Sequence, residues 1–249
     1  MKIIFIAAGS STRIGTKTLN FPKGLIKINN NSIMGIQLDL FKNKKIDNII
    51  IITGPNADKF NFKNVTYIND TNHKKHDVLG SLMVAKSHMN NEMITTYSDI
   101  IFDEKILNSI VEFKGDIGIA IELNWEKRYI NRDQHPKSEA DNVIIQNGEI
   151  VKIRKNISES KDDQIIGEFI GLMKLSKEGA KIFKNKYSEL EKTHIGKFHN
   201  APSLERAYLT DMLQELINSG LKISPIIING NWCEIDTPQD IEIAKKKFK

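Results

Sequence analysis

Short apolar runs alternate with helix-length segments along most of the chain. Lys2–Ala7, Asn48–Thr53 and Met93–Tyr97 are rich in apolar and β-branched residues, which is typical of strands covered on both faces of a sheet. Further strands are expected at Val65–Ile68, Ile117–Leu123, Phe169–Leu175 and Ile223–Ile228. Helices are expected at Ser32–Asn43, Val78–His88, Asp103–Phe113, Lys177–Glu191, Ser203–Ser219 and Gln239–Lys249. Strands joined by crossover helices form a mostly parallel sheet, so we predict a three-layer α/β/α fold.

The segment Asn124–Ser160 departs from this alternation because it is polar and irregular, apart from a hairpin signal at Asn147-Gly148. We expect it to be a small lid insertion that folds over the crevice at the carboxyl ends of the strands, where such sheets bind ligands. No internal repeat, long linker or low-complexity tract interrupts the sequence. Residues 1–249 are therefore expected to form a single domain.

The composition narrows the class of protein. With 40% apolar and 27% charged residues, the chain resembles an ordinary globular protein, which excludes global disorder. Cys233 is the only cysteine, which excludes a disulfide framework and a cysteine-cluster metal site. The longest apolar runs are far shorter than the roughly 18 residues that span a bilayer. The first residues enter a strand directly and do not resemble a signal peptide, so we expect a cytoplasmic protein with no membrane partner.

The chain carries a mild excess of positive charge. Its 36 basic and 31 acidic residues give a net charge of +5, which fits nucleic acid and a phosphate-rich small ligand equally well. Because no nucleic-acid-binding motif is found, we expect no nucleic-acid partner.

A loop of small residues directly follows the first strand. It consists of Ala7, Ala8, Gly9, Ser10, Ser11, Thr12 and Arg13. Small residues allow the backbone amides to approach a polyphosphate, and the arginine guanidinium suits phosphate oxygens. An ordinary strand-to-helix turn with a surface arginine explains the stretch equally well on spacing alone. Pro22-Lys23-Gly24-Leu25 follows, and its proline could fix the orientation of Lys23 toward the same crevice.

Two aspartates are candidate metal ligands. Asp99 follows the strand Met93–Tyr97, and Asp236 lies in the C-terminal stretch Trp232–Asp240. Magnesium ions prefer one or two carboxylates together with phosphate oxygens and waters. Asp236 also stands before Thr237-Pro238, where an aspartate often caps a helix, and the spacing does not separate the two roles.

Taken together, these motifs resemble those of a known enzyme family. Ala-Ala-Gly-x-x-x-Arg followed by Pro-Lys-x-Leu is similar to the signature of the nucleotidyltransferases that make sugar nucleotides and CDP-activated head groups, although Ser11 replaces a second glycine. The resemblance implies a Rossmann-like nucleotidyltransferase fold, Mg²⁺ as the cofactor, and Asp99 and Asp236 as its ligands. Arg13 and Lys23 would be the catalytic cations. Relatives are often dimers, so a homodimer is compatible with the resemblance.

The second half of the chain narrows the resemblance to the cytidylyltransferases that act on small phosphate or phosphonate acceptors. The matching stretches are Trp125–Asp141, Gly167–Leu172 and Trp232–Asp236. This group includes the phosphocholine, 2-aminoethylphosphonate and phosphoglutamine cytidylyltransferases. The expected acceptor residues are Trp125, Tyr129, Arg132, His135, Glu139 and Glu168. The two aromatic residues would contact a cationic or aliphatic group, Arg132 and His135 the phosphoryl oxygens, and Glu139, Asp141 and Glu168 an ammonium or amide. Alternatively, the aromatic residues pack within the lid and Arg132 pairs with Glu139.

The stretch from His73 to Ser81 corresponds to the part of relatives that approaches the nucleobase. The resemblance therefore places Asp77 and Ser81, together with Ser98, in the nucleotide site, with Asp77 able to accept from a cytosine amino group. His73 and His76 could also suggest zinc, but no further ligands cluster with them in the sequence, so we expect surface residues.

The expected reaction is transfer of CMP from CTP to the acceptor, with release of pyrophosphate. The resemblance implies that the activated product serves surface polysaccharide or phosphonate decoration. A sugar-1-phosphate nucleotidyltransferase that uses UTP or dTTP is the main alternative, and a regulatory nucleotide-binding protein is a second. A dinucleotide-dependent oxidoreductase is disfavoured, because Gly-x-Gly-x-x-Gly is missing and Thr53-Gly54-Pro55 replaces the acidic residue after the second strand.

Overall fold

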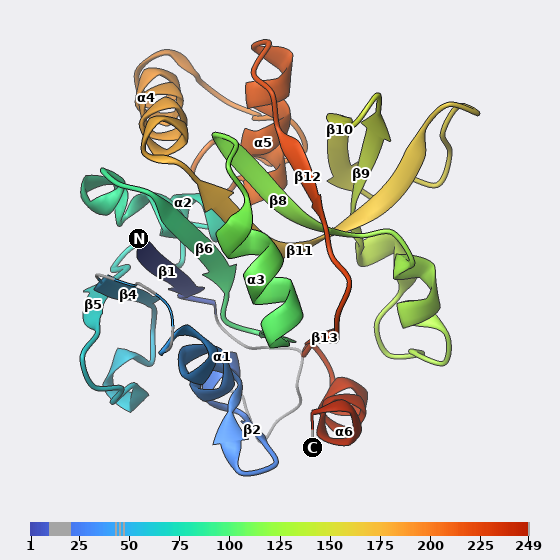
Figure 1. The fold of residues 1–249 in the computed structure, drawn as a ribbon. Coiled ribbons are helices and arrows are strands. Elements are labelled where there is room, and N and C mark those ends of the chain that lie inside the picture. The colour runs from blue at the N-terminus through green and yellow to red at the C-terminus, as the bar shows by residue number, and fades with distance from the viewer. Residues whose placement is uncertain (10–20, 43, 45, 47, 249) are drawn as a thin grey trace.

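The computed structural model describes residues 1–9, 21–42, 44, 46 and 48–248. Within them, nine strands form one mixed sheet, in which β1 (Lys2–Ala7) is central and pairs in parallel with β4 (Asn48–Thr53) and β6 (Met93–Tyr97). β5 (Thr66–Asn69) adds a fourth parallel strand at one edge. The expected bounds of β1, β4 and β6 are confirmed, as is the mostly parallel centre of the sheet (Figure 1).

Helices cover both faces of this sheet, as the continuous apolar runs predict. In β1, Ile4 and Ile6 pack on one side while Ile3 and Phe5 pack on the other, and none of the four is more than 8% exposed. The first side is covered by α2 (Val78–Met83), α4 (Lys177–Thr193) and α5 (Leu209–Asn218). The second side is covered by α1 (Ile33–Phe41) and α3 (Glu104–Glu112). Each fully buried side chain of this size contributes about 1.5–3 kcal/mol.

The other half of the sheet is mainly antiparallel. Its centre is β11 (Ile165–Leu175), which pairs antiparallel with β6, with β8 (Ile117–Glu122) and with β9 (Asp141–Gln146). β12 (Ser224–Ile227) lies parallel to β8.

The segment Asn124–Ser160 was expected to be an irregular lid, and only its first part has that character. It contains two short 3₁₀ turns, η6 (Trp125–Tyr129) and η7 (Lys137–Glu139). The second part forms the antiparallel hairpin of β9 and β10 (Glu149–Lys155), which extends the main sheet. The hairpin turn predicted at Asn147-Gly148 is confirmed, with φ angles of 51° and 78°. The buried residues of β9 belong to the core, which explains why this part joins the sheet.

Two helices differ from their expected bounds by more than two residues, and each does so for a local reason. α5 begins at Leu209 instead of Ser203, because the Tyr208 amide donates to Asp211 Oδ2 (2.9 Å) in a capping box that starts the helix there. α2 ends at Met83, and a separate 3₁₀ turn, η5 (Lys86–His88), completes the expected helix.

Several shorter elements hold the carboxyl edge of the parallel strands. β7 (Ile100–Phe102) pairs with β13 (Trp232–Glu234), which precedes the C-terminal helix α6 (Pro238–Lys247). The remaining short elements are η3 (Lys23–Leu25), β2 (Lys27–Ile28), β3 (Asn31–Ser32) and η4 (Ala57–Lys59).

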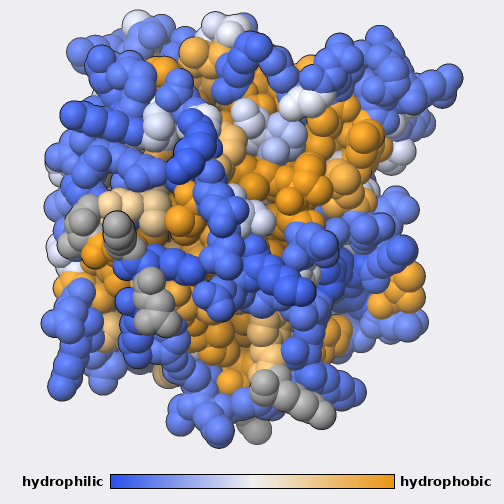
Figure 2. All heavy atoms as spheres, in the orientation of Figure 1, coloured by the Kyte–Doolittle hydropathy of each residue, from blue (hydrophilic) through white to orange (hydrophobic). Residues whose placement is uncertain are grey.

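Figure 2 shows apolar side chains gathered across the middle of one face and hydrophilic side chains around its rim. None of the described helices is both long and apolar enough to cross a membrane.

Candidate active site

A cavity of about 370 Å³ opens at the carboxyl ends of β1 and β6, where the sheet topology predicts a ligand. Its walls come from the ends of these strands, the segment before α2, the lid, the β9–β10 hairpin and the segment between β13 and α6. The predicted site residues that line it are Ala7, Ala8, Gly9, Lys23, Asp77, Ser81, Ser98, Asp99, His135, Glu139 and Asp236. The predicted residues Ser10, Ser11, Thr12 and Arg13 lie outside the described part of the chain.

Lys23, Asp99 and Asp236 meet in this cavity although they are distant in sequence. Lys23 Nζ lies 3.1 Å from Asp99 Oδ2 and also contacts Asp236 Oδ1. The turn η3 begins at Lys23 and fixes its backbone, since the Leu25 amide donates to the Pro22 carbonyl (3.0 Å). The β7–β13 pairing brings the aspartates together, and the Ile235 amide donates to the Asp99 carbonyl (2.8 Å). Burial alone would lower the pKa of Lys23, but Asp99 and Asp236 outweigh this effect and hold its pKa well above its usual value.

The two carboxylates fit a hard divalent cation. They converge on a single point that the Lys23 ammonium now occupies as a cationic partner, with side-chain exposures of 23% for Asp99 and 6% for Asp236. This donor set leaves room for phosphate oxygens and waters, as Mg²⁺ prefers.

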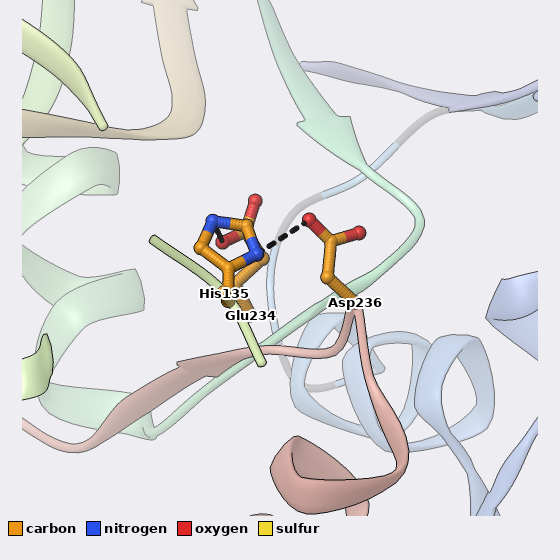
Figure 3. Close-up of side chains that lie close together, drawn as sticks. All are labelled: His135, Glu234 and Asp236. Carbon is orange, nitrogen blue, oxygen red and sulfur yellow. Dashed lines mark ion pairs between the residues drawn. The ribbon is translucent and has the colours of Figure 1, made fainter. Parts of the chain in front are cut away.

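His135 and Glu234 extend this group of ligand atoms. Figure 3 shows the His135 ring between the carboxylates of Glu234 and Asp236. His135 Nδ1 lies 3.1 Å from Asp236 Oδ2, and His135 Nε2 lies 3.7 Å from Glu234 Oε2. Burial, followed by the nearby charge of Asp236, raises the pKa of Glu234. The contact with His135 restrains the second oxygen of Asp236, so the aspartate is held from two sides.

Arg132 holds the lid against the start of α6. Its Nε donates to Asp240 Oδ1 (2.6 Å), and its Nη2 lies 3.3 Å from Glu234 Oε2. Asp240 Oδ2 in turn accepts from the amides of Asp236 (3.0 Å) and Thr237 (2.8 Å). Arg132 does not line the described cavities, and it pairs with these two acids instead of Glu139; its contact with an acceptor phosphoryl group stays a prediction. It therefore positions the segment that carries Asp236.

Hydrogen bonds fix several side chains of the cavity wall near α2, which the sequence alone does not indicate. Asp77 Oδ1 accepts from the Val78 amide (2.9 Å) and caps α2, and burial raises the pKa of Asp77. Ser81 Oγ donates to Asp70 Oδ2 (2.9 Å), and His76 Nδ1 lies 3.0 Å from the same carboxylate. His73 and His76 were expected to be surface residues, but both line the cavity. The fixed ring of His76 is therefore a candidate contact for the nucleotide.

Several carboxyl groups lie where the acceptor residues are predicted. Tyr129 Oη donates to Glu168 Oε1 (2.5 Å), and Lys155 Nζ donates to Glu139 Oε2 (2.9 Å). Trp125 is only 4% exposed and packs edge-on against Tyr129 with ring centres 6.0 Å apart. It does not line the described cavities.

Several residues of the described walls were not among the predicted site residues. Among them are Lys155, Tyr208, Trp232 and Glu234, and Asp70 supports the wall through Ser81. Trp232 and Glu234 lay within a stretch that carried the resemblance, so position alone could have indicated them. Lys155 and Tyr208 carry no local signal, because only the long-range pairing of the hairpin and the capping of α5 bring them to the cavity.

Acidic and basic side chains thus converge at the carboxyl ends of the parallel strands, where open α/β sheets bind their ligands. Residues 3–129 match the family described as the MobA-like NTP transferase domain, and the chain belongs to this family. It is therefore a nucleotidyltransferase.

Similar proteins extend the likeness over the full chain. The CTP:phosphoglutamine cytidylyltransferase of Campylobacter jejuni is 25% identical over 258 aligned residues, which cover 99% of this chain and 100% of the relative. The CTP:phosphocholine cytidylyltransferase of Streptococcus pneumoniae has a similar fold, with a TM-score of 0.72 at 19% identity over 100% of this chain and 98% of the other. The inositol-1-phosphate CTP transferase of T. maritima also has a TM-score of 0.72, at 16% identity over 99% of this chain and 95% of the other.

Proposed function

We propose that this protein is a Mg²⁺-dependent cytidylyltransferase that transfers CMP from CTP to a small phosphorylated or phosphonate acceptor. The carrying observation is the convergence of Lys23, Asp99 and Asp236 in one cavity, between the nucleotide-side loop and a pocket of carboxyl groups. The full-length similarity to a cytidylyltransferase supports CTP as the donor. In this proposal residues 1–249 form one domain, and residues 124–160 form the acceptor side.

The chain's own groups supply positioning and charge compensation. An oxygen of the acceptor's phosphoryl group attacks the α-phosphorus of CTP, and the bond from that phosphorus to the pyrophosphate oxygen breaks. A phosphate monoester is largely ionised near neutral pH, so the attacking oxygen needs no general base. Lys23 neutralises charge that develops on the transferring group, and Ala7–Gly9 and Ser98 border the space for the nucleotide.

Asp99 and Asp236 would hold the metal ion, which supplies charge neutralisation to the phosphate oxygens when bound. His135, paired with Asp236, keeps that carboxylate oriented. Arg132 positions Asp236 indirectly, through Asp240 and the backbone amides of Asp236 and Thr237.

The candidate acceptors are phosphoglutamine, 2-aminoethylphosphonate and phosphocholine. They share a phosphoryl or phosphonyl group and differ in the group at the other end. The cavity provides a separate region for that group, lined by Tyr129, Glu139 and Glu168.

Pyrophosphate release tests the proposal. The enzyme should be assayed with Mg²⁺ and each of CTP, UTP, dTTP, ATP and GTP, against the three acceptors and a hexose 1-phosphate. We expect CTP with one or more of the three acceptors to give the highest rate. Turnover only with a hexose 1-phosphate and UTP or dTTP would instead establish the sugar-nucleotide alternative.

Matched variants test the site itself. Asp99→Asn and Asp236→Asn should each lower kcat/KM at least about 100-fold, since each removes a carboxylate that would hold the metal ion whose charge compensates the transition state. Asp58→Asn is the control, because Asp58 is exposed on η4 outside the cavity walls. Near-normal turnover of either site variant with Mg²⁺ would contradict the assignment.

A further inference from the structure

A small pocket adjoins the main cavity on the acceptor side. We call it the acidic pocket. It measures about 30 Å³ and shares four wall residues with the main cavity: Tyr97, Glu139, Asp141 and Glu234. A space of this size holds a small polar group such as a water molecule.

Two carboxyl oxygens of this pocket have no hydrogen-bond partner. They are Asp141 Oδ1 and Glu168 Oε2, and both atoms are buried. Glu168 is only 4% exposed, and its other oxygen already accepts from Tyr129. An unpartnered buried polar atom costs about 1–3 kcal/mol, and an ionised group costs more. In the ionised state both oxygens only accept hydrogen bonds, so the partner that stabilises this state is a donor.

The charges in the pocket are also unbalanced. Glu139 pairs with Lys155, and Glu234 pairs with Arg132. Asp141 and Glu168 have no ion-pair partner among the residues that the structure describes. Burial accordingly raises the pKa of Asp141 to about 7 and that of Glu168 to about 8. A ligand that binds the ionised form of both groups therefore brings positive charge as well as donors.

We propose that Asp141 and Glu168 bind a primary ammonium group at the end of the acceptor that lies away from its phosphoryl group. This inference rests on the proposed function and specifies its acceptor. A primary ammonium has three N–H donors, a positive charge and the size of a water molecule. A carboxamide leaves the charge uncompensated, and a trimethylammonium group has no N–H donor for the two carboxyl oxygens.

A matched series of acceptors tests this selectivity. 2-Aminoethylphosphonate, its N-acetyl derivative and its N,N,N-trimethyl derivative share the phosphonyl group and differ only at nitrogen. With CTP and Mg²⁺, we expect kcat/KM for the primary amine to exceed that of either derivative at least about 10-fold. Equal or better use of the trimethyl derivative would overturn the inference and leave the proposed function standing.

Two variants test whether Asp141 and Glu168 cause the preference for the primary amine. Glu168→Gln and Asp141→Asn should each raise KM for the primary amine and reduce its advantage over the trimethyl derivative, while KM for CTP changes little. The control is Glu159→Gln, because Glu159 is exposed and lies outside all three cavity walls. An unchanged preference in both site variants would assign the selectivity to other residues and refute the proposal.

Binding measured by calorimetry tests the acidic pocket without requiring turnover. If no acceptor releases pyrophosphate, the proposed function fails, yet binding of 2-aminoethylphosphonate and of its trimethyl derivative can still be compared directly. Tighter binding of the primary amine, lost in Glu168→Gln, would support the pocket by itself. Equal binding of the two compounds would refute it.

Discussion

Replacing Glu168 with glutamine tests whether a buried carboxylate lies uncompensated in the acidic pocket. Burial raises the pKa of Glu168 from 4.5 to about 8; the nearby charge of Glu234 adds to this rise, whereas Tyr129 and Arg132 oppose it. The folded protein therefore retains a proton that the unfolded chain has already released between about pH 4.5 and 8. The free energy of unfolding of the wild-type protein should consequently fall as the pH rises through this window.

The size of this change in the free energy of unfolding follows from the usual and the raised pKa of Glu168. The interval from 4.5 to about 8 corresponds to about 5 kcal/mol, at about 1.4 kcal/mol per pH unit. Glutamine removes this penalty but leaves a buried amide with unpartnered atoms, which costs about 1–3 kcal/mol. We therefore expect Glu168→Gln to be about 2–4 kcal/mol more stable than wild type near pH 8.5, and no more stable near pH 4.5.

Urea unfolding of the ligand-free protein across this pH range measures the difference. Glu159→Gln is the matched control and should stay within about 0.5 kcal/mol of wild type at every pH, because the residue is exposed. Parallel pH profiles for Glu168→Gln and wild type would refute the reasoning. A stabilisation that is already complete near pH 4.5 would refute it as well.

Three further predictions concern the active site and its support. Lys23→Met should lower kcat for pyrophosphate release at least about 100-fold, because Lys23 is the described ammonium between the two aspartates; Lys222→Met, at an exposed position, should not. Arg132→Met should lower the free energy of unfolding by about 3–5 kcal/mol in urea titrations, since Asp240 is left buried without its cation. Removing divalent ions with EDTA should abolish turnover and weaken CTP binding measured by calorimetry, because the carboxylates of the two aspartates then face the triphosphate without a metal ion. Addition of Mg²⁺, but not of Na⁺, should restore both turnover and CTP binding.

The parallel half of the fold could be predicted from sequence because its signals are local. Strands covered on both faces are continuous apolar runs, so β1, β4 and β6 have the expected bounds. Asp99 could be placed at the site for the same reason, since it lies just beyond β6 at the carboxyl edge.

The position of Asp236 depends on long-range pairing that no local pattern specifies. β7 and β13 are three residues each, and they pair across about half of the chain, with Trp232 opposite Phe102. The resemblance to a family indicated Asp236, whereas the spacing left a helix cap equally plausible. The structure gives the capping role to Thr237, whose side chain accepts from the Asp240 amide. Likewise, the pairing of Arg132 with Asp240 joins residues 108 positions apart.

The parallel and the antiparallel strands of the sheet carry different parts of the candidate site, and Gly171 lies where the two halves of the sheet meet. β11 pairs with β9 up to Glu168 and with β6 from Leu172 onward, and its register with β8 shifts between Phe169 and Met173. At this break Gly171 has a φ of 80°, and a Cβ there would lie 2.3 Å from the Tyr97 ring. Tyr97 lines both the main cavity and the acidic pocket. In the proposed function, the ends of β1 and β6 border the nucleotide, whereas β9 and β11 carry the carboxyl groups of Asp141 and Glu168 in the acidic pocket. The signature after β1 therefore indicates the reaction, while the acceptor groups depend on long-range strand pairing.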